Sequence, residues 1–273
     1  MTANHQQVRT ISFDLDGTLI QGPFAGVLRE VCSAIAGPSA DELYLDVLRR
    51  HEELLLVDEY AAYGWSSMVA AVARTLGFER NEQAITARIV QRLEEVPERT
   101  RLLHPETAAV LDSLRAAGWR VLILTNGRRA FQEPVIAGAG LLPVIDGIVT
   151  SDDAGSAKPG RAVFKFARGT ADLHIHVGDR LDHDVAGSAR SGALSMLLRK
   201  DAPVSGVVQR FDDAKRSALL EYLWVRHAAE RRIDPPAQRG DLPPELVPDA
   251  VAPDLEAVAQ LVGALVAQRT AVS

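Results

Sequence analysis

The chain has 273 residues, of which 47% are hydrophobic and 24% charged, and its formal net charge is -6. These values are ordinary for a globular protein and exclude disordered and fibrous classes. The negative charge provides no basic field for a nucleic-acid partner, and Cys32, the only cysteine, excludes an intramolecular disulfide and a cysteine-based metal cluster.

Short apolar runs rich in Val, Ile and Leu predict a parallel sheet, because strands buried on both faces have few polar residues. The expected strands, in chain order, are Val8–Phe13, Arg120–Thr125, Gly147–Thr150, Ile175–Val177 and Leu194–Leu198. Helices with glycine stop signals or helical periodicity are expected between the later strands, at Glu106–Ala117, Gln132–Ala139 and Ala162–Thr170. The alternation predicts an α/β fold.

The interval between the first two strands differs from the rest. From Ile20 to about Leu103 the apolar residues recur at helical spacing and no convincing strand is present. Residues 21–103 are therefore expected to form an inserted helical domain, with Tyr63 and Trp65 in its core rather than in a pocket. Its expected helices are Ala25–Ala36, Ala40–Leu55, Ser66–Leu76 and Glu82–Val96.

The part of the chain after Leu198 is the least regular. Asp212 is expected to cap a helix over Asp213–Arg232, and the proline-rich stretch Pro235–Pro248 follows. Apolar residues from Leu255 onward predict one more packed helix. The sheet domain then consists of residues 1–20, 104–205 and 247–273, with 206–246 as an extra insertion that leaves from the carboxyl edge of the sheet.

Two carboxylates follow the first strand, in Phe13-Asp14-Leu15-Asp16-Gly17-Thr18-Leu19. Ligands bind at the carboxyl ends of strands in α/β sheets, so Asp14 and Asp16 point to a site. This run resembles the first signature of the haloacid dehalogenase-like superfamily. The resemblance implies a doubly wound, Rossmann-like parallel sheet core with an inserted helical cap domain.

Three further elements of that superfamily are similar to later parts of the chain, in the same order. Thr125, followed by Asn126, resembles the second element; Lys158 before Pro159 resembles the third; and Val177-Gly-Asp-Arg-Leu-Asp-His-Asp184 resembles the fourth. The resemblance implies that Asp14 is a nucleophile, Asp16 a general acid/base and Lys158 a neutralising cation. Phosphate binding is expected from Thr125, Asn126 and Lys158, metal binding from Asp14, Asp16 and Asp179, and outer-shell roles from Thr18 and Asp184.

Phosphoryl transfer needs positioning and charge neutralisation, and carboxylate oxygens suit Mg²⁺. The sequence therefore predicts a magnesium-dependent phosphatase that acts on a small phosphorylated metabolite through an aspartyl-phosphate. Because Asp16, the second residue of the pair, is an acid, the chain resembles the phosphotransferase branches of the superfamily rather than the dehalogenases, which lack that acid. The resemblance thus disfavours dehalogenation. The alternatives are a sugar phosphomutase with the same residues and a non-catalytic binding module.

Residues beside these motifs are weaker candidates. Arg128 and Arg129 are expected to be solvated rather than to contact substrate, Asp182 to cap a helix and His183 to be a polar loop residue. The N-terminus is polar and no run of about 20 apolar residues is present, which predicts a cytoplasmic protein without a membrane partner. Oligomeric state is left open, with a homodimer as one alternative.

Overall fold

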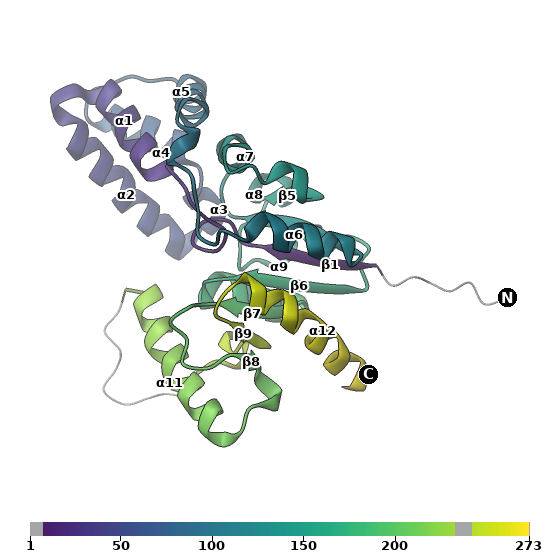
Figure 1. The fold of residues 1–273 in the computed structure, drawn as a ribbon. Coiled ribbons are helices and arrows are strands. Elements are labelled where there is room, and N and C mark those ends of the chain that lie inside the picture. Colours follow the sequence, from purple (N-terminus) through teal and green to yellow (C-terminus); the bar gives the residue numbers. More distant parts are fainter. Residues whose placement is uncertain (1–7, 233–241, 273) are drawn as a thin grey trace.

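The computed structural model describes residues 8–232 and 242–272. Within them a seven-stranded sheet has the order β5-β4-β1-β6-β7-β9-β8 (Figure 1). Neighbouring strands are parallel except for β8 and β9. The predicted α/β fold with a parallel, Rossmann-like sheet is confirmed. The strands are β1 Arg9–Phe13, β4 Trp119–Thr125, β5 Gly147–Thr150, β6 Leu173–Gly178, β7 Leu194–Leu198, β8 Gly206–Val207 and β9 Ala250–Ala252.

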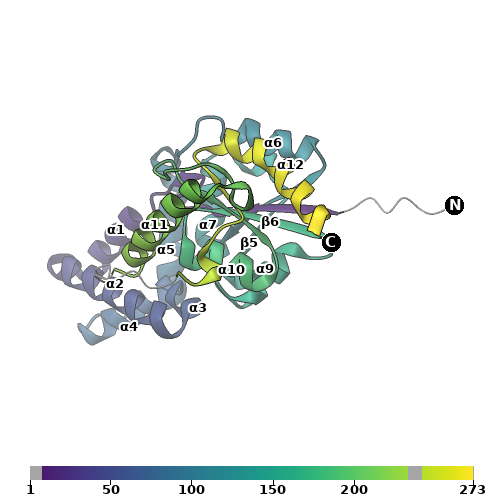
Figure 2. The ribbon, with the colours of Figure 1, turned by 90° about the horizontal axis from the view of Figure 1, so that it is seen from below.

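Helices cover both faces of this sheet. In Figure 2, α6 and α12 lie on one face, and α9 and α10 lie on the other. The central strands β1 and β6 are buried along nearly their whole length because they are covered on both sides, which explains their continuous apolar runs. The helices of the sheet domain are α6 Thr107–Ala116, α7 Arg129–Gly138, α8 Ser151–Ala154, α9 Arg161–Arg168, α10 Ala186–Ser191 and α12 Leu255–Val272.

Residues 21–103, predicted to be an inserted domain and called here the helical insertion, contain five α-helices and lie above the sheet in Figure 1. They are α1 Phe24–Ala36, α2 Ala40–Val57, α3 Glu59–Ala62, α4 Trp65–Thr75 and α5 Glu82–Glu95. The expectation of no strand here is wrong. Ile20–Gln21 (β2) pairs antiparallel with Arg101–Leu102 (β3), where the insertion leaves the sheet domain and returns to it. Two residues are too few to give the alternation from which strands are predicted.

The later part of the chain returns to the sheet. The predicted cap is confirmed, because Asp212 accepts a hydrogen bond of 2.8 Å from the Lys215 amide at the start of α11, Asp213–Glu230. β8 pairs with β9, so the sheet includes the first two residues of the segment assigned to the extra insertion. Residues 233–241 of the proline-rich stretch lie outside the described residues. Among the described helices none is both long and apolar enough to cross a bilayer.

Candidate active site

Asp14 and Asp16 lie on a tight loop directly after β1. The Asp14 amide donates to the Val177 carbonyl at 2.8 Å, and the amides of Leu19 and Ile20 both donate to the Leu15 carbonyl. Gly17 has φ +88°, and a Cβ there would lie 3.1 Å from Asp179 Oδ2. A residue with a side chain would therefore strain the backbone and crowd the neighbouring acidic loop.

A buried lysine joins the first, third and fourth motifs. Lys158 Nζ lies 2.6 Å from Asp14 Oδ1 and 2.6 Å from Asp184 Oδ1. Burial disfavours charge on Lys158, but the two carboxylates outweigh it and raise the pKa of the ammonium. Burial raises the pKa of Asp14 while Lys158 lowers it, and the net direction is upward. Thr18 donates to Asp14 Oδ2 at 3.3 Å, next to this array.

Two histidines of β6 and Ser12 form a chain of hydrogen bonds that ends at Asp184. His176 Nε2 lies 2.9 Å from Asp184 Oδ1, and its Nδ1 lies 2.8 Å from Ser12 Oγ, which also lies 2.8 Å from His174 Nε2. Burial lowers the pKa of both imidazoles, to about 3 for His174. Neither histidine was predicted as part of the site, although two histidines at i and i+2 in an apolar strand face the same side of the sheet.

Asp14, Asp179 and Asp184 each place a carboxylate oxygen within 4.8 Å of the others. The Asp184 oxygens accept from Lys158, His176 and the Arg180 amide. By contrast, Asp179 Oδ1 is buried and has no hydrogen-bond partner among the described residues, although Oδ2 lies 3.3 Å from Arg199. Burial, followed by the charges of Asp14 and Asp184, raises the pKa of Asp179 to about 7. Carboxylate oxygens gathered around the unpartnered Asp179 Oδ1 are the hard ligands that Mg²⁺ prefers.

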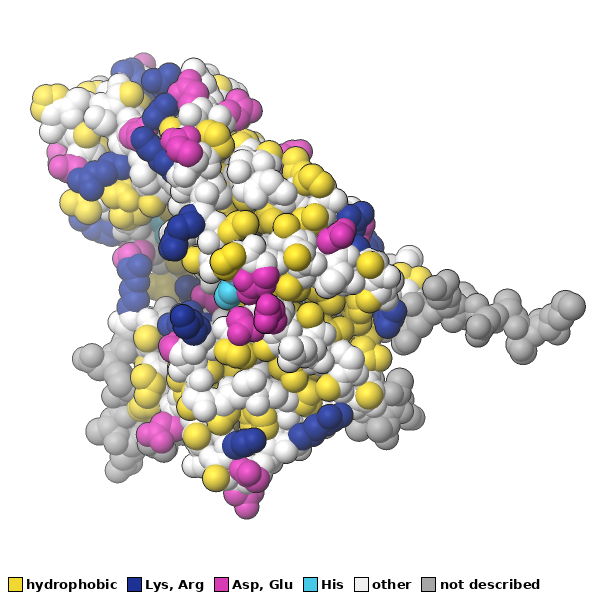
Figure 3. All heavy atoms as spheres, viewed as in Figure 1, with side chains coloured by type: hydrophobic (Ala, Val, Ile, Leu, Met, Phe, Trp, Pro, Cys, Tyr) yellow, Lys and Arg dark blue, Asp and Glu magenta, His cyan; other side chains and the backbone are white. Residues whose placement is uncertain are grey.

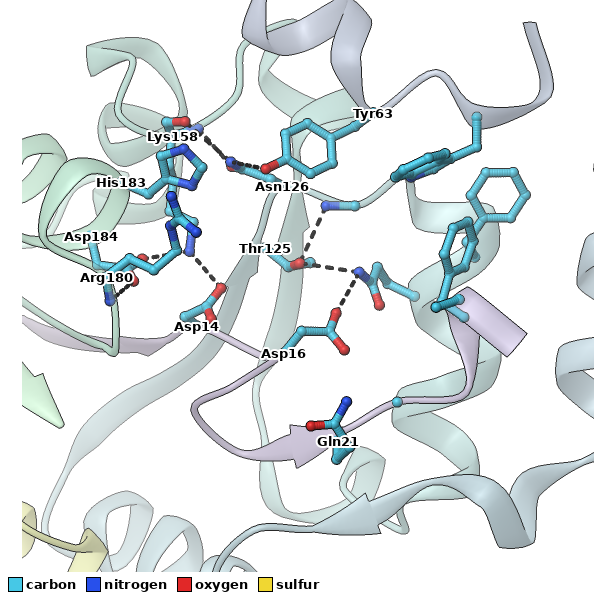
Figure 4. Close-up of a pocket in the computed structure, with 17 residues that line it drawn as sticks. Asp14, Asp16, Gln21, Tyr63, Thr125, Asn126, Lys158, Arg180, His183 and Asp184 are labelled. Carbon is cyan, nitrogen blue, oxygen red and sulfur yellow. Dashed lines mark hydrogen bonds and ion pairs between the residues drawn. The ribbon is translucent and has the colours of Figure 1, made fainter. Parts of the chain in front are cut away.

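Asp16 points away from this cluster, into the pocket (Figure 4). Gln132 Nε2 donates to Asp16 Oδ2 at 3.2 Å and lies 3.3 Å from Thr125 Oγ1. Asp16 is exposed toward the pocket, but the protein around it partly desolvates the carboxylate, and this desolvation together with the charge of Asp14 raises the pKa of Asp16 to about 6. Gln132, on α7, was not predicted.

Asn126 holds the backbone of Lys158. Its Oδ1 accepts from the Lys158 amide at 2.6 Å, and its Nδ2 donates to the Lys158 carbonyl at 3.1 Å and to the Tyr63 hydroxyl at 3.2 Å. Thr125, one residue earlier, accepts from the Gly127 amide at 3.3 Å. The observed contacts of Asn126 are thus with protein groups, and its binding to phosphate stays a prediction.

These groups border a pocket of about 310 Å³, with Asp14, Asp16, Thr125 and Lys158 on one side. Figure 3 shows the surface hollowed between the helical insertion and the sheet domain. The other side is an aromatic wall made of Phe24, Tyr63, Trp65 and Phe131. The Phe24 ring centroid lies 5.4 Å from that of Trp65 and 5.5 Å from that of Phe131. Trp65 therefore lines the pocket and also packs against the hydrophobic core, as predicted, whereas the prediction that Tyr63 lies in the core rather than in a pocket is wrong.

Other predictions about flanking residues also need correction. Arg128 is not simply solvated: its guanidinium lies 2.5 Å from Asp152, donates to the Tyr60 carbonyl at 3.0 Å and stacks over the Tyr60 ring. Arg129 pairs with Asp153.

In the acidic loop, Asp182 pairs with Arg180 at 2.7 Å, while His183 lines the pocket, as does Arg180. The fold of this loop thus places the side chains of Arg180 and His183 at the pocket.

Comparison with known proteins gives three consistent results. The model of the haloacid dehalogenase-like hydrolase family matches residues 8–192. Glyceraldehyde 3-phosphate phosphatase of Methanocaldococcus jannaschii is 28% identical over 204 residues, which cover 71% of this chain and 86% of that protein. Phosphoglycolate phosphatase of Yersinia pseudotuberculosis is 27% identical over 192 residues, with 67% and 77% covered.

A solved structure shares the fold. The crystal structure of a HAD phosphatase from Thermococcus onnurineus aligns with a TM-score of 0.61 and 20% identity, over 94% of this chain and 98% of the other. At this identity the likeness supports the architecture alone.

Proposed function

Because the chain belongs to the haloacid dehalogenase-like hydrolase family, we propose that it is a magnesium-dependent phosphatase that forms an aspartyl-phosphate on Asp14. The predicted enzyme class, a phosphoric monoester hydrolase, is confirmed by the family match and by the phosphatases among its relatives. The finer proposal rests on one observation: Asp14 is held by a buried lysine, while a second acid, Asp16, stands apart from them on the pocket side.

The residues of the site divide the chemical work. Asp14 attacks the phosphorus atom, and Lys158, 2.6 Å from its carboxylate, stabilises negative charge on the transferring group. Asp16 protonates the leaving oxygen and then accepts a proton from the water that hydrolyses the aspartyl-phosphate. A pKa of about 6 suits both roles, because such a carboxyl exchanges its proton close to neutral pH. The Thr125 hydroxyl is placed to contact a phosphoryl oxygen.

Asp14 and Asp179 would hold the magnesium ion, together with the Asp16 carbonyl. When bound, Mg²⁺ neutralises charge on the phosphoryl oxygens. Support for this set comes from the buried, unpartnered Oδ1 of Asp179 and from the raised pKa of its carboxyl, both of which indicate a position suited to a cation. Asp184 is better placed to orient Lys158 than to bind metal, because its oxygens already accept from protein donors.

The leaving group would contact the aromatic wall. The helical insertion contributes Phe24, Tyr63 and Trp65 to the pocket, so we assign it the role of a cap that reads the leaving group and excludes water. A pocket of about 310 Å³ accommodates a small phosphorylated metabolite rather than a phosphoprotein. No observation favours the phosphomutase or the non-catalytic module.

Phosphate release from a panel of small phosphate esters tests the proposal. We expect turnover with Mg²⁺ that is lost with EDTA and falls at least about 10³-fold in Asp14→Asn, since the amide is not a nucleophile. The matched control is Asp152→Asn, in an acid that pairs with Arg128 outside the pocket. Equal rates in Asp14→Asn and wild type would refute the mechanism.

A further inference from the structure

Helix α11, Asp213–Glu230, lies beyond the part of the chain that matches the family model and contributes no residue to the pocket. It is the green helix below the sheet in Figure 1. Its buried residues Leu219 and Leu223 belong to one hydrophobic cluster with Leu181 and Val185. These two residues begin and end the π-helical turn Leu181–Val185, which follows Asp179. The helix therefore packs directly on the acidic loop of the site.

The last residue of α11 reaches the backbone of this loop. Both oxygens of Glu230 accept from the Leu181 amide, at 3.2 and 2.9 Å, and Oε2 also accepts from the Asp182 amide at 3.1 Å. These amides open the π-helical turn, where backbone donors have no partner within the turn itself. The Glu230 side chain is only 3% exposed, so water does not replace it there.

The loop is thus held from two sides. On the inner side, Asp184 Oδ2 accepts from the Arg180 amide at 3.0 Å while Oδ1 binds Lys158. On the outer side, Glu230 accepts from the next two amides. Burial and the charge of Asp182 raise the pKa of Glu230 to about 7, although the hydrogen bonds from the Leu181 and Asp182 amides lower it in part. Arg226 forms an ion pair with Glu230 at 3.2 Å.

We propose that Glu230 is a positioning residue, which fixes the backbone of residues 179–184 so that Asp179 faces Asp14 and Asp184 meets Lys158. This inference rests on the proposed function, because it assigns Glu230 to the same metal and phosphoryl site. It makes α11 part of the catalytic unit, although the helix is outside the matched region. The physical basis is that a metal ligand keeps its affinity only when the groups behind it hold its orientation.

The test compares Glu230→Ala, Glu230→Asp and Glu230→Gln with wild type in the full chain. Mg²⁺ affinity is measured by calorimetry, kcat and KM by phosphate release, and unfolding by thermal melting. We expect Glu230→Ala to weaken Mg²⁺ binding and kcat about tenfold, with KM little changed. Glu230→Gln keeps both an acceptor oxygen and the length of the side chain, and should recover most of the loss. Glu230→Asp is too short to reach both amides and should resemble Glu230→Ala.

Glu221→Ala, at an exposed position of the same helix and outside the pocket, is the matched control and should retain the wild-type Mg²⁺ affinity and kcat. If Glu230→Ala does not fold, Glu230→Asp and Glu230→Gln are compared instead. The inference then requires a lower Mg²⁺ affinity and kcat in Glu230→Asp than in Glu230→Gln. A lower melting temperature with unchanged Mg²⁺ affinity and kcat would reduce Glu230 to a structural role and overturn the inference alone. A wild-type chain that bound no Mg²⁺ would overturn the proposed function as well.

Discussion

The two sides of the pocket are built from different interactions. One side is a buried array of opposite charges, in which Lys158 lies between Asp14 and Asp184. The other side is the aromatic wall, to which the helical insertion contributes three of four rings and in which Phe24 contacts Trp65 and Phe131. The charged side fixes a few atoms within hydrogen-bond distance, whereas rings tolerate changes of shape. This difference suits a site that keeps one chemistry while the leaving group varies between relatives.

Replacing Lys158 tests the charged side and should have the largest effect. Lys158→Met keeps the length of the side chain but leaves two buried carboxylates without their cation. We expect the free energy of unfolding to fall by about 3 kcal/mol and kcat to fall about 10³-fold. Denaturant unfolding in EDTA and phosphate release in Mg²⁺ measure the two effects.

Lys165→Met, at an exposed position on α9, serves as the control and should change neither quantity. Wild-type stability in Lys158→Met would show that the buried charges are not coupled as the distances indicate.

Replacing Trp65 tests the aromatic wall. Trp65→Ala should lower kcat/KM about tenfold for an ester with a bulky leaving group, because the lost contacts serve that group. Hydrolysis of acetyl phosphate, whose leaving group is small, should change little. Phe166→Ala, in an exposed ring outside the pocket, is the control. An equal loss with both substrates would assign Trp65 to the chemical step and remove the contrast between the two sides.

Tyr63 connects the two sides, and its replacement should have the smallest effect. Tyr63→Phe keeps the ring and removes the hydroxyl that accepts from Asn126 at 3.2 Å. Loss of one hydrogen bond of about 1 kcal/mol corresponds to about a fivefold fall in kcat/KM, the same for every ester. Tyr44→Phe, outside the pocket on α2, provides the control for the kinetic assay. A loss that depended on the ester would indicate that the hydroxyl contacts the leaving group.

The central strands were predictable because burial on both faces imposes a continuous apolar run. β7 and the edge strand β5 have the predicted bounds, and β1 and β4 differ from prediction by one residue at their first position. β6 begins two residues earlier and ends one residue later than predicted. The two-residue strands β2, β3 and β8 were not predicted. β8 has two residues, Gly206–Val207, and strands of this length carry no periodicity.

The same contrast applies to the site. Asp14, Lys158, Asp179 and Asp184 were predicted from the resemblance of their motifs to those of the superfamily. For Asp14 and Asp179 the position directly after a strand also points to the carboxyl edge of the sheet, whereas Lys158 comes after α8. The structure brings these four together. Gln132 and Glu230 lie on helices, and their contacts with the site depend on how those helices pack against it. A sequence pattern does not predict such packing, so both residues were identified only from their hydrogen bonds in the structure.

The position of β1 in the middle of the sheet has a consequence for how the chain folds. Asp14 and Lys158 are 144 residues apart in the sequence, and Ser12 and His176 are 164 apart. β1 is synthesised first, but it can pair with its neighbours only after β4 and β6 have been synthesised. Long-range pairing of this kind slows folding, because loop closure precedes the contacts that compensate it. During synthesis, the catalytic geometry therefore forms late, after the helices of the insertion have left the ribosome.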